Sequence, residues 1–188
     1  MTATIDLSQE CLSEVFMIPV SSAISAGLTW SKSSRKHGYE LKRNGEIVAS
    51  LQRTGCWSSA YQAESPHGKW KFRRTGFWRA ATEVVDSTSG ARIAVLKPNW
   101  GGGGTLVFSD GQTFQITCRG LWRPVWSVLA ENGEPVLSIH SREKTVVVPD
   151  QSLLPEDRLI LLATFARYVM QQAAEDAASV AVVVAVTS

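Results

Sequence analysis

Short segments of alternating hydrophobic and polar residues run through most of the chain and are separated by turn residues. In residues 112–118, for example, Phe114, Ile116 and Cys118 lie on one face of an extended chain, and Gln115 lies on the other. Asn-Gly, Ser-Gly and Asp-Gly dipeptides between the segments are typical of β-hairpin turns. The pattern therefore predicts consecutive antiparallel hairpins.

Roughly a dozen such segments at fairly even spacing indicate a β-sandwich or a β-barrel. Ala91, Ile93 and Val95 share one face of the segment 91–97, which again fits a half-buried sheet. The strands that we expect are 14–19, 28–30, 39–42, 47–51, 57–63, 69–73, 78–85, 91–97, 105–108, 112–118, 125–130, 135–140 and 144–148.

A single apolar segment follows the last expected strand. Residues 159–170 read LILLATFARYVM, in which Thr164 and Arg167 interrupt the apolar surface. A helix that is apolar nearly all round requires burial on every side. Together with the hairpins, it predicts a mainly β fold, a closed antiparallel barrel of about twelve strands around a buried C-terminal helix. Arg167 would either extend its aliphatic stem to the barrel rim or pair with a carboxylate.

The start of this helix is marked by its local sequence. Pro155 suits a first helical position, where its missing N–H costs nothing. Glu156 and Asp157 then place negative charge at the positive end of the helix dipole. We expect the helix to cover about residues 155–174, a length of roughly 30 Å.

The chain is short enough for one domain, which we place at residues 14–176. Residues 1–13 are expected to be a flexible arm, and residues 177–188 an apolar tail. Val180–Val186 is β-branched and uncharged, and such a segment promotes aggregation when it is exposed. It would therefore continue the helix against the barrel, add an edge strand or form a contact between copies of the chain.

Composition limits the class of protein. Seven Trp residues are expected mainly in the core, with ligand stacking as the alternative. Cys11, Cys56 and Cys118 are widely spaced, which argues against a disulfide framework or a zinc site and favours a reducing cytoplasm. The N-terminus does not resemble a signal peptide. The apolar run is shorter than the ~18–20 residues of a membrane span, so we expect a soluble protein that is cytoplasmic or peripheral at a membrane.

The net charge is only +2, but positive charge is concentrated in one stretch. Residues 32–79 contain eleven Lys or Arg and three Glu. Such a region attracts phosphates or anionic lipid when its cations converge in space. A solvated outer barrel wall explains the same composition.

The densest part of this stretch is residues 69–79. In a strand, Lys69, Lys71 and Arg73 share one face, and Trp70 and Phe72 share the other. Cations beside aromatic residues suit a lipid headgroup surface, whereas buried aromatics argue against stacking on single-stranded nucleic acid. The candidate lipid- or anion-binding residues are Lys69, Lys71, Arg73, Arg74, Arg79, Lys42 and Arg43.

Recognised catalytic motifs are absent from the sequence. Gly101–Gly104 lacks the Gly-Lys-Ser/Thr of a phosphate-binding loop and is expected to be a flexible turn. His37, His67 and His140 lack metal-ligand spacing, and no carboxylate pair has a reason to face another. We therefore expect no catalytic residues, no metal and no cofactor.

Several of these features together resemble the tubby C-terminal-like superfamily, and within it the LURP-one-related proteins and the phospholipid scramblases. The features are the hairpin turns and the segments Gly76-Phe77-Trp78, Asn99-Trp100 and Leu154-Pro155-Glu156-Asp157. The resemblance covers about residues 14–175. It implies a closed barrel around a central C-terminal helix and phosphoinositide binding through basic residues on the barrel wall. The Cys-rich lipidation segment and the acidic calcium-binding segment of scramblases have no counterpart here, so scrambling activity is not implied.

The sequence is thus consistent with a non-enzymatic binding module. The first hypothesis is docking on anionic lipid, including phosphoinositides, or on a phosphorylated partner through the basic region. The alternative is a structural or protein-interaction barrel that self-associates through Val180–Val186, without a lipid role. Nucleic acid is not an expected partner. A third reading, an enzyme or small-molecule carrier with a site in the barrel mouth, depends on whether the helix leaves a cavity.

Overall fold

The computed structural model describes residues 27–34, 38–55, 59–76, 81–99, 103–149 and 154–187, and the side chains of the final helix as far as residue 178. The expected strand at 14–19, the arm at 1–13 and Arg79 lie outside these residues. The described part of the chain forms twelve strands and one helix: β1 (Leu28–Lys32), β2 (Gly38–Arg43), β3 (Glu46–Arg53), β4 (Tyr61–Ser65), β5 (Gly68–Thr75), β6 (Ala81–Asp86), β7 (Arg92–Pro98), β8 (Gly104–Phe108), β9 (Thr113–Arg119), β10 (Val125–Ala130), β11 (Pro135–His140), β12 (Thr145–Val147) and α1 (Glu156–Thr187).

The strands form a closed antiparallel barrel in which each strand pairs with its neighbours in sequence. The barrel closes where β1 pairs with β12, with Leu28 opposite Val146. The predicted Asn-Gly hairpin is present, because Asn44 and Gly45 both have positive φ, 50° and 88°, as a two-residue turn between twisted strands requires. The fold class predicted from the hairpin pattern is confirmed.

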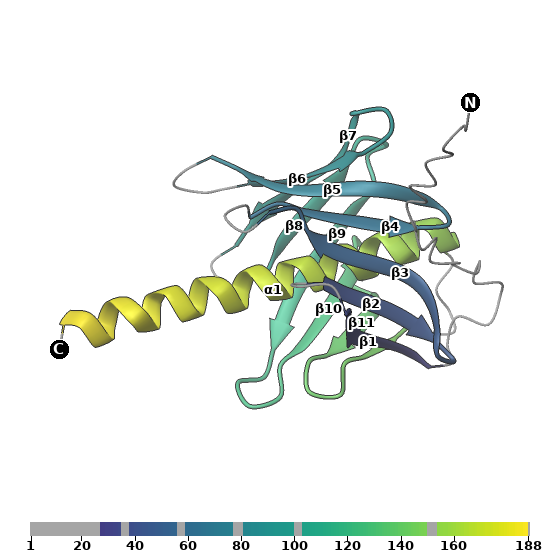
Figure 1. Ribbon diagram of the computed structural model, residues 1–188. Helices are drawn as coiled ribbons and strands as arrows, with labels where there is room; N and C mark the ends of the chain where they lie inside the picture. Colours follow the sequence, from purple (N-terminus) through teal and green to yellow (C-terminus); the bar gives the residue numbers. More distant parts are fainter. Residues whose placement is uncertain are drawn as a thin grey trace, which may run out of the picture.

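Helix α1 runs through the barrel, as Figure 1 shows. Between Leu159 and Val169 every apolar side chain is at most 5% exposed. The hydroxyl of Thr164 is satisfied within the helix, since it donates to the carbonyls of Ile160 and Leu161. The burial on all sides that the sequence predicts is therefore confirmed.

The predicted end of the helix near residue 174 is too early. Helix α1 has 32 residues and continues to Thr187, beyond the barrel (Figure 1). Residues 171–187 contain no Gly or Pro that would stop a helix. The backbone of the tail is therefore a helix and not an edge strand, but this helix continues beyond the barrel instead of lying against it.

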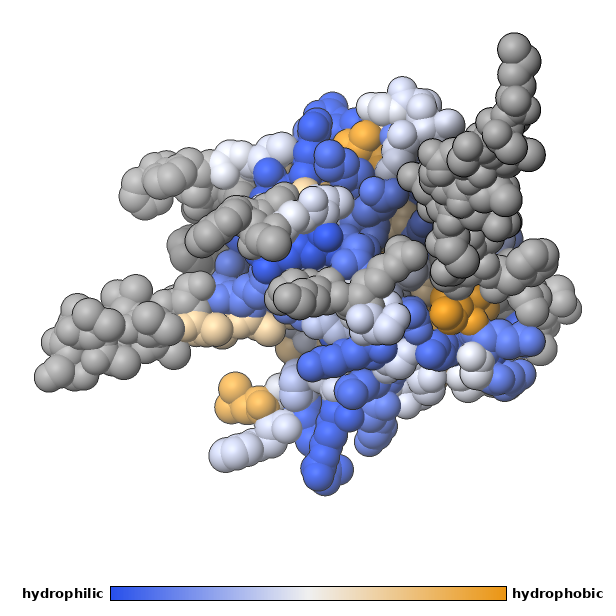
Figure 2. Space-filling model, viewed as in Figure 1, coloured by the Kyte–Doolittle hydropathy of each residue, from blue (hydrophilic) through white to orange (hydrophobic). Residues whose placement is uncertain are grey.

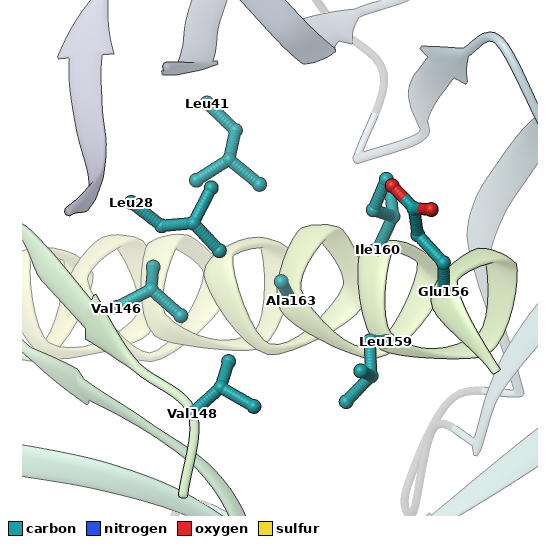
Figure 3. Close-up of a pocket in the computed structure, with 8 residues that line it drawn as sticks. All are labelled: Leu28, Leu41, Val146, Val148, Glu156, Leu159, Ile160 and Ala163. Carbon is teal, nitrogen blue, oxygen red and sulfur yellow. The ribbon is translucent and has the colours of Figure 1, made fainter. Parts of the chain in front are cut away.

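An aromatic cluster joins α1 to β4 and β5. Phe165 meets Phe72 edge-to-face, with ring centroids 5.1 Å apart, and Tyr168 meets Tyr61 in the same way at 5.5 Å. Figure 3 shows the apolar lining around the first turns of α1, and the residual gap there is about 10 Å³, no more than the space of one water. The described side chains therefore leave room for no more than one water between these residues.

The face assignment in β7 differs from the alternation noted in the sequence. Ala94 and Leu96 are the buried residues, while Ile93 and Val95 are half-buried on the opposite face. Both faces of this segment carry apolar residues, so the sequence alone does not choose between them, and pairing with β6 and β8 sets the register. In β9 the predicted inward positions Phe114 and Ile116 are buried.

Candidate functional site

The predicted cationic stripe, defined as Lys69, Lys71 and Arg73, lies on the outer face of β5. All three side chains are exposed, whereas Trp70 and Phe72 between them are buried. Strand alternation therefore places these residues as the sequence predicts.

Neighbouring carboxylates neutralise much of this stripe. Lys69 pairs with Glu64 of β4 at 2.5 Å, and Arg73 pairs with Glu83 of β6 at 2.9 Å. The hydrogen bond from Arg73 lowers the pKa of Glu83 below its usual range. Among the described residues, Lys71 is the member of the stripe without an ion pair. Exposed pairs contribute only about 0–1 kcal/mol, but they reduce the local positive field.

The other candidate cations do not join the stripe. Lys42 pairs with Glu40 on its own strand at 3.0 Å, and β2 is separated from β5 by two strands. Arg43 also lies on β2, and Arg79 lies outside the described residues. Arg74 pairs with Asp176 of α1 at 2.9 Å, where the helix leaves the barrel.

We call this end of the barrel the exit end, because α1 emerges there. The strand directions place the connections 120–124 and 141–144 at the exit end, since β9, β11 and β5 run in the same direction. The opposite end holds the start of the helix, where Arg158 pairs with Asp110 at 2.7 Å.

The loop 120–124 at the exit end exposes two large apolar residues. Leu121 is 98% exposed and Trp122 is 95% exposed. Arg119 and Arg123 on either side are also exposed. The barrel face in Figure 2 is predominantly hydrophilic, and among the residues that the structure describes Leu121 and Trp122 are the large apolar side chains that are almost fully exposed.

The shape of this loop is set by Gly120. Its φ is +88°, and a Cβ atom there would lie 2.9 Å from the carbonyl oxygen of Arg123. Both observations require glycine, so the backbone holds the Leu121-Trp122 pair in a tight turn. This pair is not among the residues predicted from the sequence, although two large apolar residues close to a Gly and a Pro in an expected loop are a visible signal.

A cavity of about 460 Å³ opens beside the loop at the exit end. One side of it is α1, and the other is formed by β1 and β9–β11 with the connections 120–124 and 141–144. Its lining residues are Trp30, Cys118, Pro124, Trp126, Ile139, Ser141, Lys144, Arg167, Met170, Gln171, Ala173 and Ala174. The helix therefore leaves space at the exit end, which answers the question that the sequence left open, whether the helix leaves a cavity in the barrel.

Contacts on the other side of α1 explain this asymmetry. Tyr61 donates a hydrogen bond to Glu175 at 3.0 Å, and Tyr39 donates one to Gln171 at 2.6 Å. These bonds and the Arg74–Asp176 pair attach the helix to the β2–β5 wall. The cavity lies on the side away from most of these attachments.

Arg167 projects from α1 into the region between Tyr39 and the cavity. Its guanidinium carbon lies 3.9 Å from the centroid of the Tyr39 ring, a cation–π contact. Burial lowers the pKa of Arg167 from its usual value. The sequence left two arrangements open for Arg167, a reach to the barrel rim or a pair with a carboxylate. No carboxylate of the described residues pairs with it, and it stacks on the Tyr39 ring.

Comparison with known proteins adds no assignment. No family model, curated protein or solved structure matches the chain. Within the described residues, no helix has both the length and the apolar character needed to cross a membrane. The same residues contain no group of three or more His, Cys, Asp or Glu side chains placed to hold a metal ion.

Proposed function

We propose that the protein is a non-enzymatic, tubby-like binding module that docks peripherally on anionic lipid headgroups. The docking surface is the exit end of the barrel. The observation that carries the proposal is the nearly complete exposure of Leu121 and Trp122 between two exposed arginines.

The two apolar residues and the two arginines have different roles in this proposal. The Trp122 ring and the Leu121 side chain enter the interfacial region, where an amphipathic indole is favourable. Arg119 and Arg123 meet lipid phosphates at the depth of the headgroups, and each basic residue near an anionic surface contributes about 1 kcal/mol. The combination of apolar insertion and charge gives two binding terms, of which only the second depends on salt.

The β5 stripe is a weaker candidate for the same function. Two of its three cations already have carboxylate partners across the strand pairs. Lipid phosphates would have to compete with these pairs, whereas Arg119 and Arg123 make no ion pair with any carboxylate of the described residues.

The test is co-sedimentation with neutral and with anionic or phosphoinositide-containing vesicles at low and high salt. We expect binding to anionic vesicles that weakens with salt and is lost in the double variant Leu121→Ser, Trp122→Ser. The matched comparison is the triple variant Lys69→Gln, Lys71→Gln, Arg73→Gln, which we expect to bind nearly as the parent does. Loss of binding in the triple variant alone would move the docking surface to the β5 wall, and no binding by the parent chain would reject lipid docking.

A second candidate function is self-association through Val180–Val186. Its support is the continuation of α1 to Thr187, beyond the barrel. Deleting residues 177–188 should then lower the molar mass measured by light scattering. An unchanged mass would reject this alternative.

A further inference from the structure

The cavity at the exit end has the size of a small-molecule site. Its volume of about 460 Å³ lies within the range of roughly 300–1,000 Å³ that is typical of ligand pockets. The exposed residues Lys144 and Ala174 belong to its lining, so the cavity is open to solvent at its rim.

Most of the lining is apolar and is provided by large side chains. Trp30 and Trp126 are 3% and 7% exposed, Ile139 is 1% exposed, and Met170 adds a flexible thioether. These surfaces suit a hydrocarbon chain and leave little for a small polar anion such as free phosphate to contact.

Two cationic residues, Arg167 and Lys144, also belong to the lining of the cavity. Arg167 carries a partly buried guanidinium whose contact is the face of Tyr39, and no carboxylate lies within ion-pair distance of it among the described residues. A charge removed from water is costly unless it is paired. Lys144 adds a second cation at the rim. The cavity therefore favours a negatively charged group.

Two hydrogen-bond donors in the lining also lack partners. The indole Nε1 of Trp30 and the hydroxyl Oγ of Ser141 are buried and make no hydrogen bond within the described part of the chain. Buried donors of this kind are nearly always satisfied in folded proteins. Both residues belong to the cavity lining, so a ligand with an oxyanion brings acceptors to the part of the barrel that holds these donors.

We propose that this cavity binds an anionic amphiphile with a single hydrocarbon chain, such as a fatty-acid carboxylate. The carboxylate accepts hydrogen bonds from Arg167, and the chain covers the apolar lining at Trp126, Ile139 and Met170. The cavity borders the loop surface proposed for docking, since Pro124 lines it, but the exposed Leu121 and Trp122 are not among its lining residues, so the two sites use different side chains.

The test is isothermal titration with laurate below its micelle concentration. Lauryl alcohol, which keeps the chain without the charge, and acetate, which keeps the charge without the chain, serve as ligand controls. We expect laurate to bind at least tenfold more tightly than either control. Equal affinity for laurate and lauryl alcohol would overturn the proposal.

Two variants locate the ligand. Arg167→Met should weaken laurate binding at least tenfold, and Ala174→Trp, which fills the cavity rim while Arg167 stays in place, should weaken it as well. The matched control is Arg158→Met. Arg158 also stacks on an aromatic ring, that of Phe108 at 4.0 Å, but it lies at the opposite end of the same helix. The Arg158→Met variant should therefore bind laurate as the parent protein does. Laurate binding that survives both cavity variants, with folding verified by circular dichroism, would overturn the proposal.

Vesicle binding by the same variants distinguishes a dispersed amphiphile from a membrane lipid as the ligand. The Leu121→Ser, Trp122→Ser variant should lose vesicle binding but keep laurate binding, and Arg167→Met should show the reverse. The two experiments therefore distinguish a failure of the cavity proposal from a failure of the membrane-docking proposal. Loss of both activities in both variants would show one continuous lipid site and would overturn the assignment of a separate cavity ligand.

Discussion

The phenolic hydroxyl of Tyr61 donates a hydrogen bond of 3.0 Å to the carboxylate of Glu175, which lies 114 residues later in the chain. This bond joins β4 to α1 at the point where the helix leaves the barrel. The same carboxylate accepts hydrogen bonds from Gln171 and Gln172, and Arg53 lies 3.8 Å from it. Glu175 therefore fixes the position of the helix against the β2–β5 wall and, with it, the width of the cavity on the opposite side.

Replacing Glu175 by Gln tests this attachment. Because the substitution removes a charged acceptor from a half-buried network, we expect the free energy of unfolding to fall by about 1–3 kcal/mol in urea titrations. The control is Asp176→Asn, which removes the more exposed pair with Arg74 and should cost less than about 1 kcal/mol. Equal losses in the two variants would contradict the role given to Glu175.

The edge-to-face contact between Phe72 and Phe165 is the basis of a second prediction. Both rings are fully buried, at 0% exposure. Phe165→Ala leaves a cavity between the helix and β5, and such truncations cost about 3–5 kcal/mol. Leu121→Ala, which removes a solvent-exposed side chain, should change the free energy of unfolding by no more than about 0.5 kcal/mol. A loss below 1 kcal/mol in Phe165→Ala would show that the helix is not held by this packing.

These contacts also show which parts of the molecule local sequence can predict. The Asn44-Gly45 turn and the apolar helix depend on residues close together in the chain, so the barrel and its central helix follow from them. The positive field of the β5 stripe does not, because Glu64 and Glu83 reach it only through strand pairing. Composition counts cations correctly but cannot show which of them have partners.

The exit end was harder to predict for a related reason. Arg74 and Asp176 are 102 residues apart, and the rotation of α1 set by such pairs decides which wall of the barrel the helix leaves uncovered. The cavity is a consequence of that rotation. The exposed Leu121-Trp122 pair, by contrast, could have been found from its loop context alone.

The glycine run gives a third prediction. The sequence predicts a flexible turn at Gly101–Gly104, but Gly104 is the first residue of β8. A Cβ atom there would lie 2.3 Å from the carbonyl oxygen of Lys97 on the paired strand β7. The absence of a side chain at Gly104 therefore lets the backbones of β7 and β8 approach closely.

Gly104→Ala should therefore strain the β7–β8 pair. We expect the free energy of unfolding to fall by about 1–3 kcal/mol, as in other cases of overpacking, and thermal unfolding monitored by circular dichroism to shift downwards. The neighbouring Thr105→Ala adds no atoms and is the control. An unchanged midpoint for Gly104→Ala would mean that the strands separate without cost.

The fourth prediction concerns alkaline pH. Burial raises the pKa of Tyr168 from its usual 10.0 to about 12, and burial together with the Glu175 charge raises the pKa of Tyr61. The folded state thus holds these phenolic protons more tightly than the unfolded state does. The resulting stability is present below about pH 10 and is lost as the pH rises through the folded-state value of Tyr168, about 12.

Urea titrations between about pH 9 and about pH 11 measure this loss. Other groups also titrate there, so the informative quantity is the difference between the parent chain and Tyr168→Phe, which keeps the ring but has no phenolic proton. We expect the stability of Tyr168→Phe to fall less steeply with pH than that of the parent chain. Parallel curves would mean that Tyr168 ionises in the folded barrel as easily as in the unfolded chain, and hence that the exit end admits water down to its ring.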